Sequence, residues 1–223
     1  MDRRSFLKNS AAASALMTLP LASKVASAGK KSNSLIFASP GTPQSLDSEF
    51  DTSLGTFDFV SACYDSLIAY DTMPDPKDPD AKREDLKKYP DRPSGHKMYG
   101  KLAESWKIAP DMTSVTFNLR KGVKSHWGNE LTAEDVKWSW DRKLAMGAIG
   151  GFFASVIGLS KPEQIQVDGK YTVSFRLDKP APMLMRLHRN PYNNILDSKK
   201  CKEVATSDDP WAKEWLKNNV AGY

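Results

Sequence analysis

Two stretches of the chain alternate apolar and polar residues around a turn signal, and they restrict the fold more than any other feature. The first covers residues 106–119 and turns at Ala109-Pro110-Asp111. The second covers residues 165–177 and turns at Asp168-Gly169. Alternation with period two places one face of a strand against a core, and Asp-Gly is a strong signal for a two-residue hairpin loop. The sequence therefore predicts two antiparallel β-hairpins.

A well-marked helix start lies between the two hairpins. Thr132 stands at a typical N-cap position and Asp135 follows three residues later, close to a capping box. Apolar residues then recur at helical spacing, at Val136, Trp140 and Leu144. This spacing predicts a helix that begins after Thr132 and buries one face. Helices and strands in irregular alternation, with local hairpins, are typical of an α/β fold.

Four further segments have a local signature. Residues 35–38 are apolar and predict a short buried strand, and residues 56–68 have helical apolar spacing. Residues 71–98 contain five prolines among charged residues, which predicts an excursion over the surface. Asp209-Pro210 predicts the start of a last helix, because proline is favoured at the first helical position.

The N-terminus reads as an export signal that is removed from the mature protein. Paired arginines precede a weakly apolar stretch that is too short to span a bilayer. The pattern resembles a twin-arginine signal, with an ordinary Sec signal as the alternative. We expect a signal peptide over residues 1–28 and a mature domain over residues 29–223. The residues on which this depends are Arg3, Arg4, Phe6 and Leu7 for export, and Ala26 and Ala28 for cleavage.

Net charge argues against a nucleic-acid partner. The whole chain carries +5. Without residues 1–28 it has 28 basic and 26 acidic side chains, a balance of +2. Much of the basicity therefore belongs to the export signal, and no basic stripe remains to bind phosphates. No cysteine follows the apolar stretch, so we expect no lipid anchor there and a mature protein that is free in the periplasm or secreted.

The middle of the chain resembles a known family. The blocks Leu102-Ala103-Glu104-Ser105-Trp106, Leu119-Arg120-Lys121-Gly122-Val123-Lys124 and Leu131-Thr132-Ala133-Glu134-Asp135-Val136 occur in that order. They resemble the signature of extracellular solute-binding proteins of the peptide/nickel class, family 5, which serve ABC importers. Ser45-Leu46-Asp47 resembles the opening loop of that family. Val220-Ala221-Gly222-Tyr223 resembles the start of its Gly-Pro-Tyr turn.

The resemblance implies a periplasmic binding protein-like fold of class II, with two lobes that close over a solute. It implies a monomer that captures an oligopeptide or similar small solute and delivers it to a membrane permease. Family members are about twice as long, so residues 29–223 would form the first lobe and the second lobe would be absent. This length is compatible with three alternatives: a truncated product, an expression fragment, or one half of a split gene.

Two segments are candidates for ligand contact. Ser39, Pro40, Gly41 and Thr42 follow the first predicted strand, where α/β folds often present ligand-facing groups. Gly150-Gly151-Phe152-Phe153 would offer aromatic surface on a flexible loop, with Phe152 and Phe153 as the contacts. Loop packing is the alternative for both segments. Glu104, Arg120 and Asp135 are better explained by a structural ion pair and a helix cap than by ligand binding.

The sequence lacks the motifs of an enzyme. It contains no dinucleotide glycine loop, no G-x-S-x-G and no H-E-x-x-H. Three widely spaced histidines do not form a local metal site, and Cys63 and Cys201 are not in a redox motif. We therefore expect no catalytic residue, metal or cofactor. A non-functional fragment and an exported cofactor-binding redox enzyme are the alternatives, and a nickel or haem ligand is possible within the family. The histidines are His96, His126 and His188.

Overall fold

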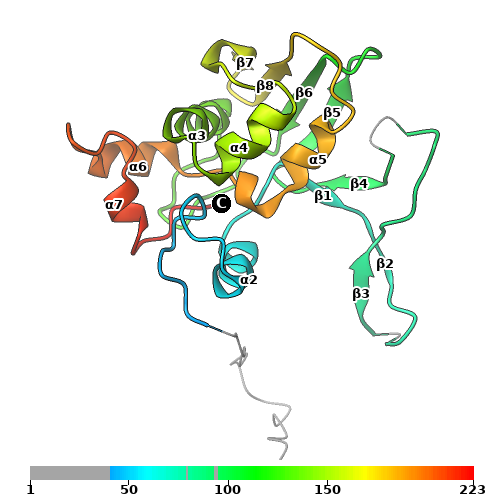
Figure 1. Cartoon of the computed structure of the whole chain (residues 1–223), viewed down its shortest axis with the longest axis horizontal. Coiled ribbons are helices and arrows are strands. Elements are labelled where there is room, and N and C mark those ends of the chain that lie inside the picture. The colour runs from blue at the N-terminus through cyan, green and yellow to red at the C-terminus, as the bar shows by residue number, and fades with distance from the viewer. Residues whose placement is uncertain (1–40, 79, 93–94) are drawn as a thin grey trace, which may run out of the picture. The chain divides into compact units, whose positions relative to one another are not determined.

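A four-stranded antiparallel sheet joins the two predicted hairpins. The computed structural model describes residues 41–78, 80–92 and 95–223, so residues 1–28 and the predicted strand at 35–38 lie outside the described residues. The strand order is β5-β6-β8-β7, and the two hairpins meet through the β6–β8 pair. Both predicted hairpins are confirmed (Figure 1). The strands are β5 (Ala103–Ile108), β6 (Ser114–Leu119), β7 (Ile165–Gly169) and β8 (Thr172–Arg176).

The turn of the second hairpin does not lie where the sequence predicts it. Gly169 pairs with Thr172, so the loop between the strands is Lys170-Tyr171 and Asp168-Gly169 belongs to β7. The register shifts between Val167 and Gly169, which marks a β-bulge at Asp168. The carboxylate of Asp168 accepts a hydrogen bond from the Ser174 hydroxyl on β8. This cross-strand bond holds the Asp-Gly pair inside the strand and moves the turn two residues on.

The predicted capped helix is confirmed as α3 (Ala133–Met146). The Asp135 carboxylate accepts hydrogen bonds from the backbone N–H and the hydroxyl of Thr132, both at 2.8 Å. The helix ends at Gly147, whose φ of 59° is the left-handed conformation that glycine adopts readily. It packs on β7 and β8, and the predicted inward residues Val136 and Trp140 are fully buried.

The predicted helix over residues 56–68 is confirmed only in its first part. Helix α2 (Leu54–Cys63) ends because Tyr64 is extended, with φ −132° and ψ 146°. The following residues form β1 (Ile68–Tyr70), which pairs antiparallel with β4 (Met98–Gly100). Leu67 and Ile68 are buried as predicted, but they enter the core at the start of a strand and not in a last turn of the helix.

The segment between β1 and β4 forms a largely exposed arm. Its strands β2 (Thr72–Pro74) and β3 (Lys82–Glu84) pair with each other in a separate two-stranded ribbon. Figure 1 shows this ribbon projecting away from the four-stranded sheet. Asp85 and His96 are its buried polar residues within the described part. Asp85 accepts a hydrogen bond from Tyr89 within the arm, and His96 contacts Arg186 at 3.1 Å.

The last helix begins later than the sequence predicts. Helix α7 (Lys213–Leu216) starts three residues after Pro210, because Ala212 has a left-handed φ of 53°. The Asp209 carboxylate accepts hydrogen bonds from the backbone N–H groups of Lys213 and Glu214, both at 2.9 Å, and so caps the shifted start. The remaining helical elements are α4 (Ile149–Val156), η2 (Pro162–Gln164), α5 (Leu184–Arg189), η3 (Pro191–Asn193) and α6 (Ser198–Val204).

A histidine lies in the centre of the core. The ring of His188, on α5, is 4.2 Å from the ring centroid of Phe175, 4.8 Å from Phe117 and 5.4 Å from Trp140. Neither ring nitrogen has a hydrogen-bond partner, and burial lowers the pKa of His188 from 6.5 to about 3. The imidazole is therefore neutral in the folded chain at ordinary pH.

This histidine makes the chain less stable in mild acid. Below pH 6.5 the unfolded chain takes up a proton at His188 and the folded chain does not, so stability falls as pH decreases toward 3. We expect the free energy of unfolding to lose about 2 kcal/mol from this group between pH 7.5 and 5.0. In urea unfolding, His188→Leu should show a correspondingly smaller loss between pH 7.5 and 5.0. The value at pH 7.5 isolates the packing effect of the substitution, and an unchanged pH slope would contradict the assignment.

Candidate functional site

The predicted opening loop leads into a buried turn. Ser39 and Pro40 lie outside the described residues, while Gly41 and Thr42 are exposed. A few residues later the chain turns inward, and Asp47, Ser48 and Glu49 are each only 3% exposed. Three consecutive buried polar residues require partners, because an unpaired buried charge is strongly unfavourable.

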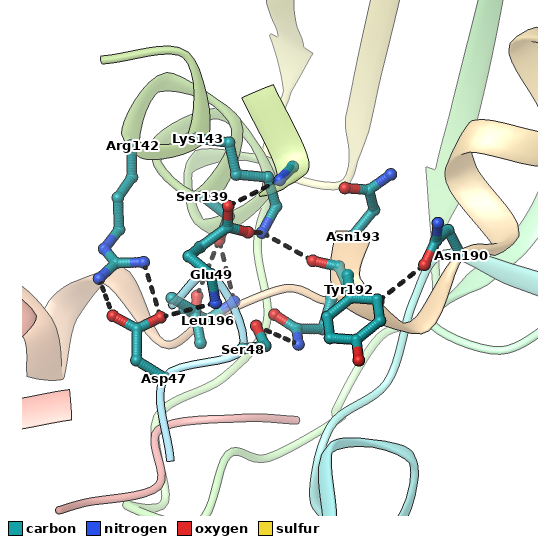
Figure 2. A network of polar contacts seen from close by, with 12 residues as sticks. Asp47, Ser48, Glu49, Ser139, Arg142, Lys143, Asn190, Tyr192, Asn193 and Leu196 are labelled. Carbon is teal, nitrogen blue, oxygen red and sulfur yellow. Dashed lines mark hydrogen bonds and ion pairs between the residues drawn. The ribbon is translucent and has the colours of Figure 1, made fainter. Parts of the chain in front are cut away.

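Asp47 is paired with an arginine on α3. The guanidinium of Arg142 donates to both carboxylate oxygens of Asp47 through two nitrogens, and its third nitrogen, Nε, donates to the Trp211 carbonyl at 2.9 Å. The side chains are 0% and 2% exposed. Arg142 therefore fixes both the opening segment and the residues before α7 to α3. Figure 2 shows its contact with Asp47.

Glu49 is paired with the next residue of α3. Lys143 Nζ donates to Glu49 Oε1 at 2.7 Å, and both side chains are 0% exposed. The second carboxylate oxygen accepts the backbone N–H of Gly150 at 2.8 Å, at the start of α4. A Cβ at Gly150 would lie 2.8 Å from both Glu49 Oε1 and Lys143 Cδ, so only glycine allows this approach.

A third contact attaches the segment around η3. The Asn194 amide donates to the Ser48 hydroxyl at 2.9 Å, and Lys143 Nζ also approaches the Tyr192 carbonyl at 3.3 Å. Figure 2 shows Ser48, Lys143 and Tyr192 gathered between α3 and the segment 190–196. The network thus joins four parts of the chain that are far apart in sequence.

The second predicted ligand segment is a helix, so the prediction of a flexible loop at residues 150–153 is wrong. Gly150 to Phe153 lie within α4. Phe152 is 60% exposed and Phe153 is half-buried. Glu49, seven residues after Thr42, accepts the backbone N–H of Gly150 in this second segment. Their role in ligand binding stays a prediction.

Two hollows on the surface share Tyr70 and Arg189. The first has a volume of about 410 Å³ and is lined mainly by α2, β1, β4 and η3. The second has a volume of about 250 Å³ and is lined by α4 and α5, including Phe153. We call the two together the Tyr70 groove. Its most distinctive lining side chains are Phe57, Tyr99, Lys101, Val156 and Met183.

Arg189 lies at the centre of the Tyr70 groove. Its guanidinium carbon is 4.3 Å from the centroid of the Tyr70 ring, a cation–π contact. One terminal nitrogen donates to the Glu84 carboxylate of the arm at 3.2 and 3.5 Å. The Glu84 side chain is 47% exposed, so this ion pair is accessible to water.

The signature residue Arg120 does not act as predicted. Its guanidinium donates to the carbonyl oxygens of Lys101 and Gly100, at 2.7 and 3.0 Å, and Glu104 is exposed. The predicted ion pair is therefore replaced by a backbone clamp between β4 and β6. The predicted capping role of Asp135 is confirmed, and this carboxylate also accepts two hydrogen bonds from Ser198.

Within residues 41–78, 80–92 and 95–223, no group of histidine, cysteine and acidic side chains is arranged to hold a metal ion. In the same residues no helix has both the length and the apolar character needed to cross a bilayer. Cys63 and Cys201 are both free thiols. The arrangement offers charges, aromatic rings and hollows, which are the features of a binding surface.

The comparison with family models is decisive. The model of "Bacterial extracellular solute-binding proteins, family 5 Middle" matches residues 97–223, more than half of the chain. The chain belongs to this family. The resemblance predicted from the signature blocks is thereby confirmed, and the matched family is one of solute-binding proteins rather than enzymes.

Curated relatives of this family-5 chain are named as peptide-binding proteins. "Probable D,D-dipeptide-binding periplasmic protein DdpA" of Escherichia coli is 29% identical over 93% of this chain and 36% of its own length. "Dipeptide-binding protein" of Escherichia coli is 30% identical over 76% of this chain and 31% of its own length. The chain thus spans about a third of the length of these relatives, so the expectation that family members are about twice as long is too low.

Solved structures confirm the fold class. Haemophilus influenzae OppA in complex with the peptide RPPGFSPFR has a TM-score of 0.58 at 22% identity, over 78% of this chain and 32% of that one. The binding protein AgaA in complex with agropinic acid also has a TM-score of 0.58, at 23% identity, over 82% of this chain and 30% of that one. At these identities the likeness supports a partial class II periplasmic binding fold.

Sequence reasoning missed the residues that organise this site. Glu49 and Lys143 are 94 residues apart, and neither belongs to a local motif. Arg189 and Glu84 are 105 residues apart. The one available signal was Gly150, whose position at the start of an otherwise apolar helix indicates a close approach of another group.

Breaking the Lys143–Glu49 pair should destabilise the chain strongly. Lys143→Met leaves the Glu49 carboxylate buried without a cation, and we expect a loss of about 3–5 kcal/mol in the free energy of unfolding. Lys137→Met on the same helix is the matched control. Its ion pair with Asp141 is 24% exposed on both sides, so we expect a loss below about 1 kcal/mol. Equal losses in urea unfolding would contradict a special role for the buried pair.

Proposed function

We propose that this chain is part of the substrate-binding component of an ABC importer, and that its solute is a short peptide or a similar small molecule. The observation that carries the proposal is the family match over residues 97–223. It is supported by relatives that are named as dipeptide-binding and oligopeptide-binding proteins. The accessible groove with aromatic and charged lining is compatible with such a ligand.

In this proposal the described residues form one wall of a solute cleft. The opening segment, held by Asp47 and Glu49, and the Tyr70 groove present groups toward a solute that a second lobe covers. Closure is favoured only by contacts that the solute makes better in the closed state. The closed form then docks on a membrane permease, and the chain performs no chemistry of its own.

The proposed location is the periplasm, as a monomer exported with the segment 1–28 as its signal. The support comes from the sequence, through Arg3 and Arg4 and through the small residues Ala26 and Ala28. The periplasmic character of the named relatives agrees with this location.

The test is the intact mass and the ligand content of the protein purified from its native periplasm. We expect a mass well above the 24.8 kDa of this chain, because the relatives are about three times as long, together with a co-purifying peptide that mass spectrometry can sequence. A mass that matches residues 29–223, with no bound solute, would contradict the importer role and favour a non-functional fragment.

A separate prediction concerns affinity. Residues 29–223 supply one wall of the proposed cleft, so a peptide bound there remains largely exposed to water. We expect isothermal titration calorimetry of this chain with dipeptides to give dissociation constants no tighter than about 1 mM, equivalent to about −4.1 kcal/mol. Micromolar binding would show that a second lobe is not needed.

A further inference from the structure

The Tyr70 groove has an excess of positive charge and an apolar end. Three cations line it, Lys101, Arg186 and Arg189, against a single lining carboxylate, Glu84. Lys101 is neutralised from outside the lining by Asp65, and Arg186 contacts the ring nitrogen Nε2 of His96 at 3.1 Å. Arg189 is the cation that both hollows share.

Arg189 is prepared to bind a carboxylate. The Tyr70 ring supports one face of its guanidinium, which fixes the orientation of the planar donor group. Its Nε atom is buried and has no hydrogen-bond partner, so its donors are not all used. Its partner Glu84 lies on a three-residue strand of the exposed arm, and such accessible pairs contribute little stability.

The second hollow is suited to an apolar side chain. Phe153, Val156, Ile157, Met183 and Leu187 contribute to its lining. Val156 and Met183, which both line this hollow, are 59% and 49% exposed. An apolar group that fills this hollow would cover them and would lie directly beside Arg189.

We propose that Arg189 binds the C-terminal carboxylate of a short peptide in exchange for Glu84, and that the last, apolar side chain of the peptide occupies the hollow between α4 and α5. This inference rests on the proposed function and adds to it a ligand class and an anchoring residue. Glu84 then acts as a built-in competitor for the guanidinium. Phe153 contacts the ligand from α4, while the exposed Phe152 lies outside the hollow lining.

The test uses nitrogen-15 NMR of the 223-residue chain with the dipeptide Ala-Phe as the probe. We expect the Nε–H signal of Arg189 to shift during the titration. Ala-Phe amide, which lacks the carboxylate, and Ala-Gly, which lacks the apolar side chain, should each bind about tenfold more weakly. No shift at Arg189 with Ala-Phe would overturn the proposal.

Two substitutions give opposite expected effects. Arg189→Gln should weaken Ala-Phe binding about tenfold, whereas Glu84→Gln should strengthen it by roughly two- to fivefold because the competitor is removed. Arg83→Gln, which removes a charge from the adjacent position on β3, should have no effect. Unchanged affinity in both Arg189→Gln and Glu84→Gln would overturn the anchor.

The anchor and the proposed function fail in different ways. If Ala-Phe shifts signals near Gly41 and Thr42 but not near Arg189, a solute wall exists and the anchor is wrong. If a peptide co-purifies with the native protein, the importer role stands whatever the result for Arg189. If none does, a shift at Arg189 still shows a carboxylate site on this chain.

Discussion

The buried pairs Asp47–Arg142 and Glu49–Lys143 hold the described part of the chain together. The two cations are consecutive residues of α3, and their side chains reach a single turn of the opening segment. Arg142 also donates to the Trp211 carbonyl before α7, and Lys143 donates to the Tyr192 carbonyl in η3. The Glu49 carboxylate accepts the backbone N–H of Gly150 at the start of α4. Displacing the opening segment would leave these buried charges uncompensated, which disfavours other positions of the segment that leads to the candidate site.

The sequence predicts the parts of the fold that local chemistry specifies. The capping box at Thr132 and the two alternating hairpins depend on residues within a few positions of one another, and the structure contains them. The predicted position of the second turn is wrong because Asp168 accepts a hydrogen bond from Ser174 across the sheet, and this contact depends on strand pairing. The predicted end of helix α2 is wrong because apolar residues at helical spacing can also enter the core as a strand.

The candidate site is less predictable than the fold, for a physical reason. Its organising contacts join side chains about a hundred residues apart, and single charged residues carry no periodic signal. A lysine and a glutamate in a soluble chain are usually solvated, so burial gives them their role only after the chain has folded. The family signature is informative about identity because it consists of packing, capping and turn residues, and for the same reason it does not mark the ligand contacts.

The pairing of β1 with β4 has a consequence for how this chain can vary. Ile68 opposes Gly100 and Tyr70 opposes Met98. This pairing holds the two ends of the arm side by side and does not involve the residues of the arm. The entropy of closing a loop rises only with the logarithm of its length, by about 0.6 kcal/mol for each doubling. The arm can therefore gain or lose residues during evolution with little effect on the four-stranded sheet, and a surface that meets other molecules can be rebuilt there independently of the core.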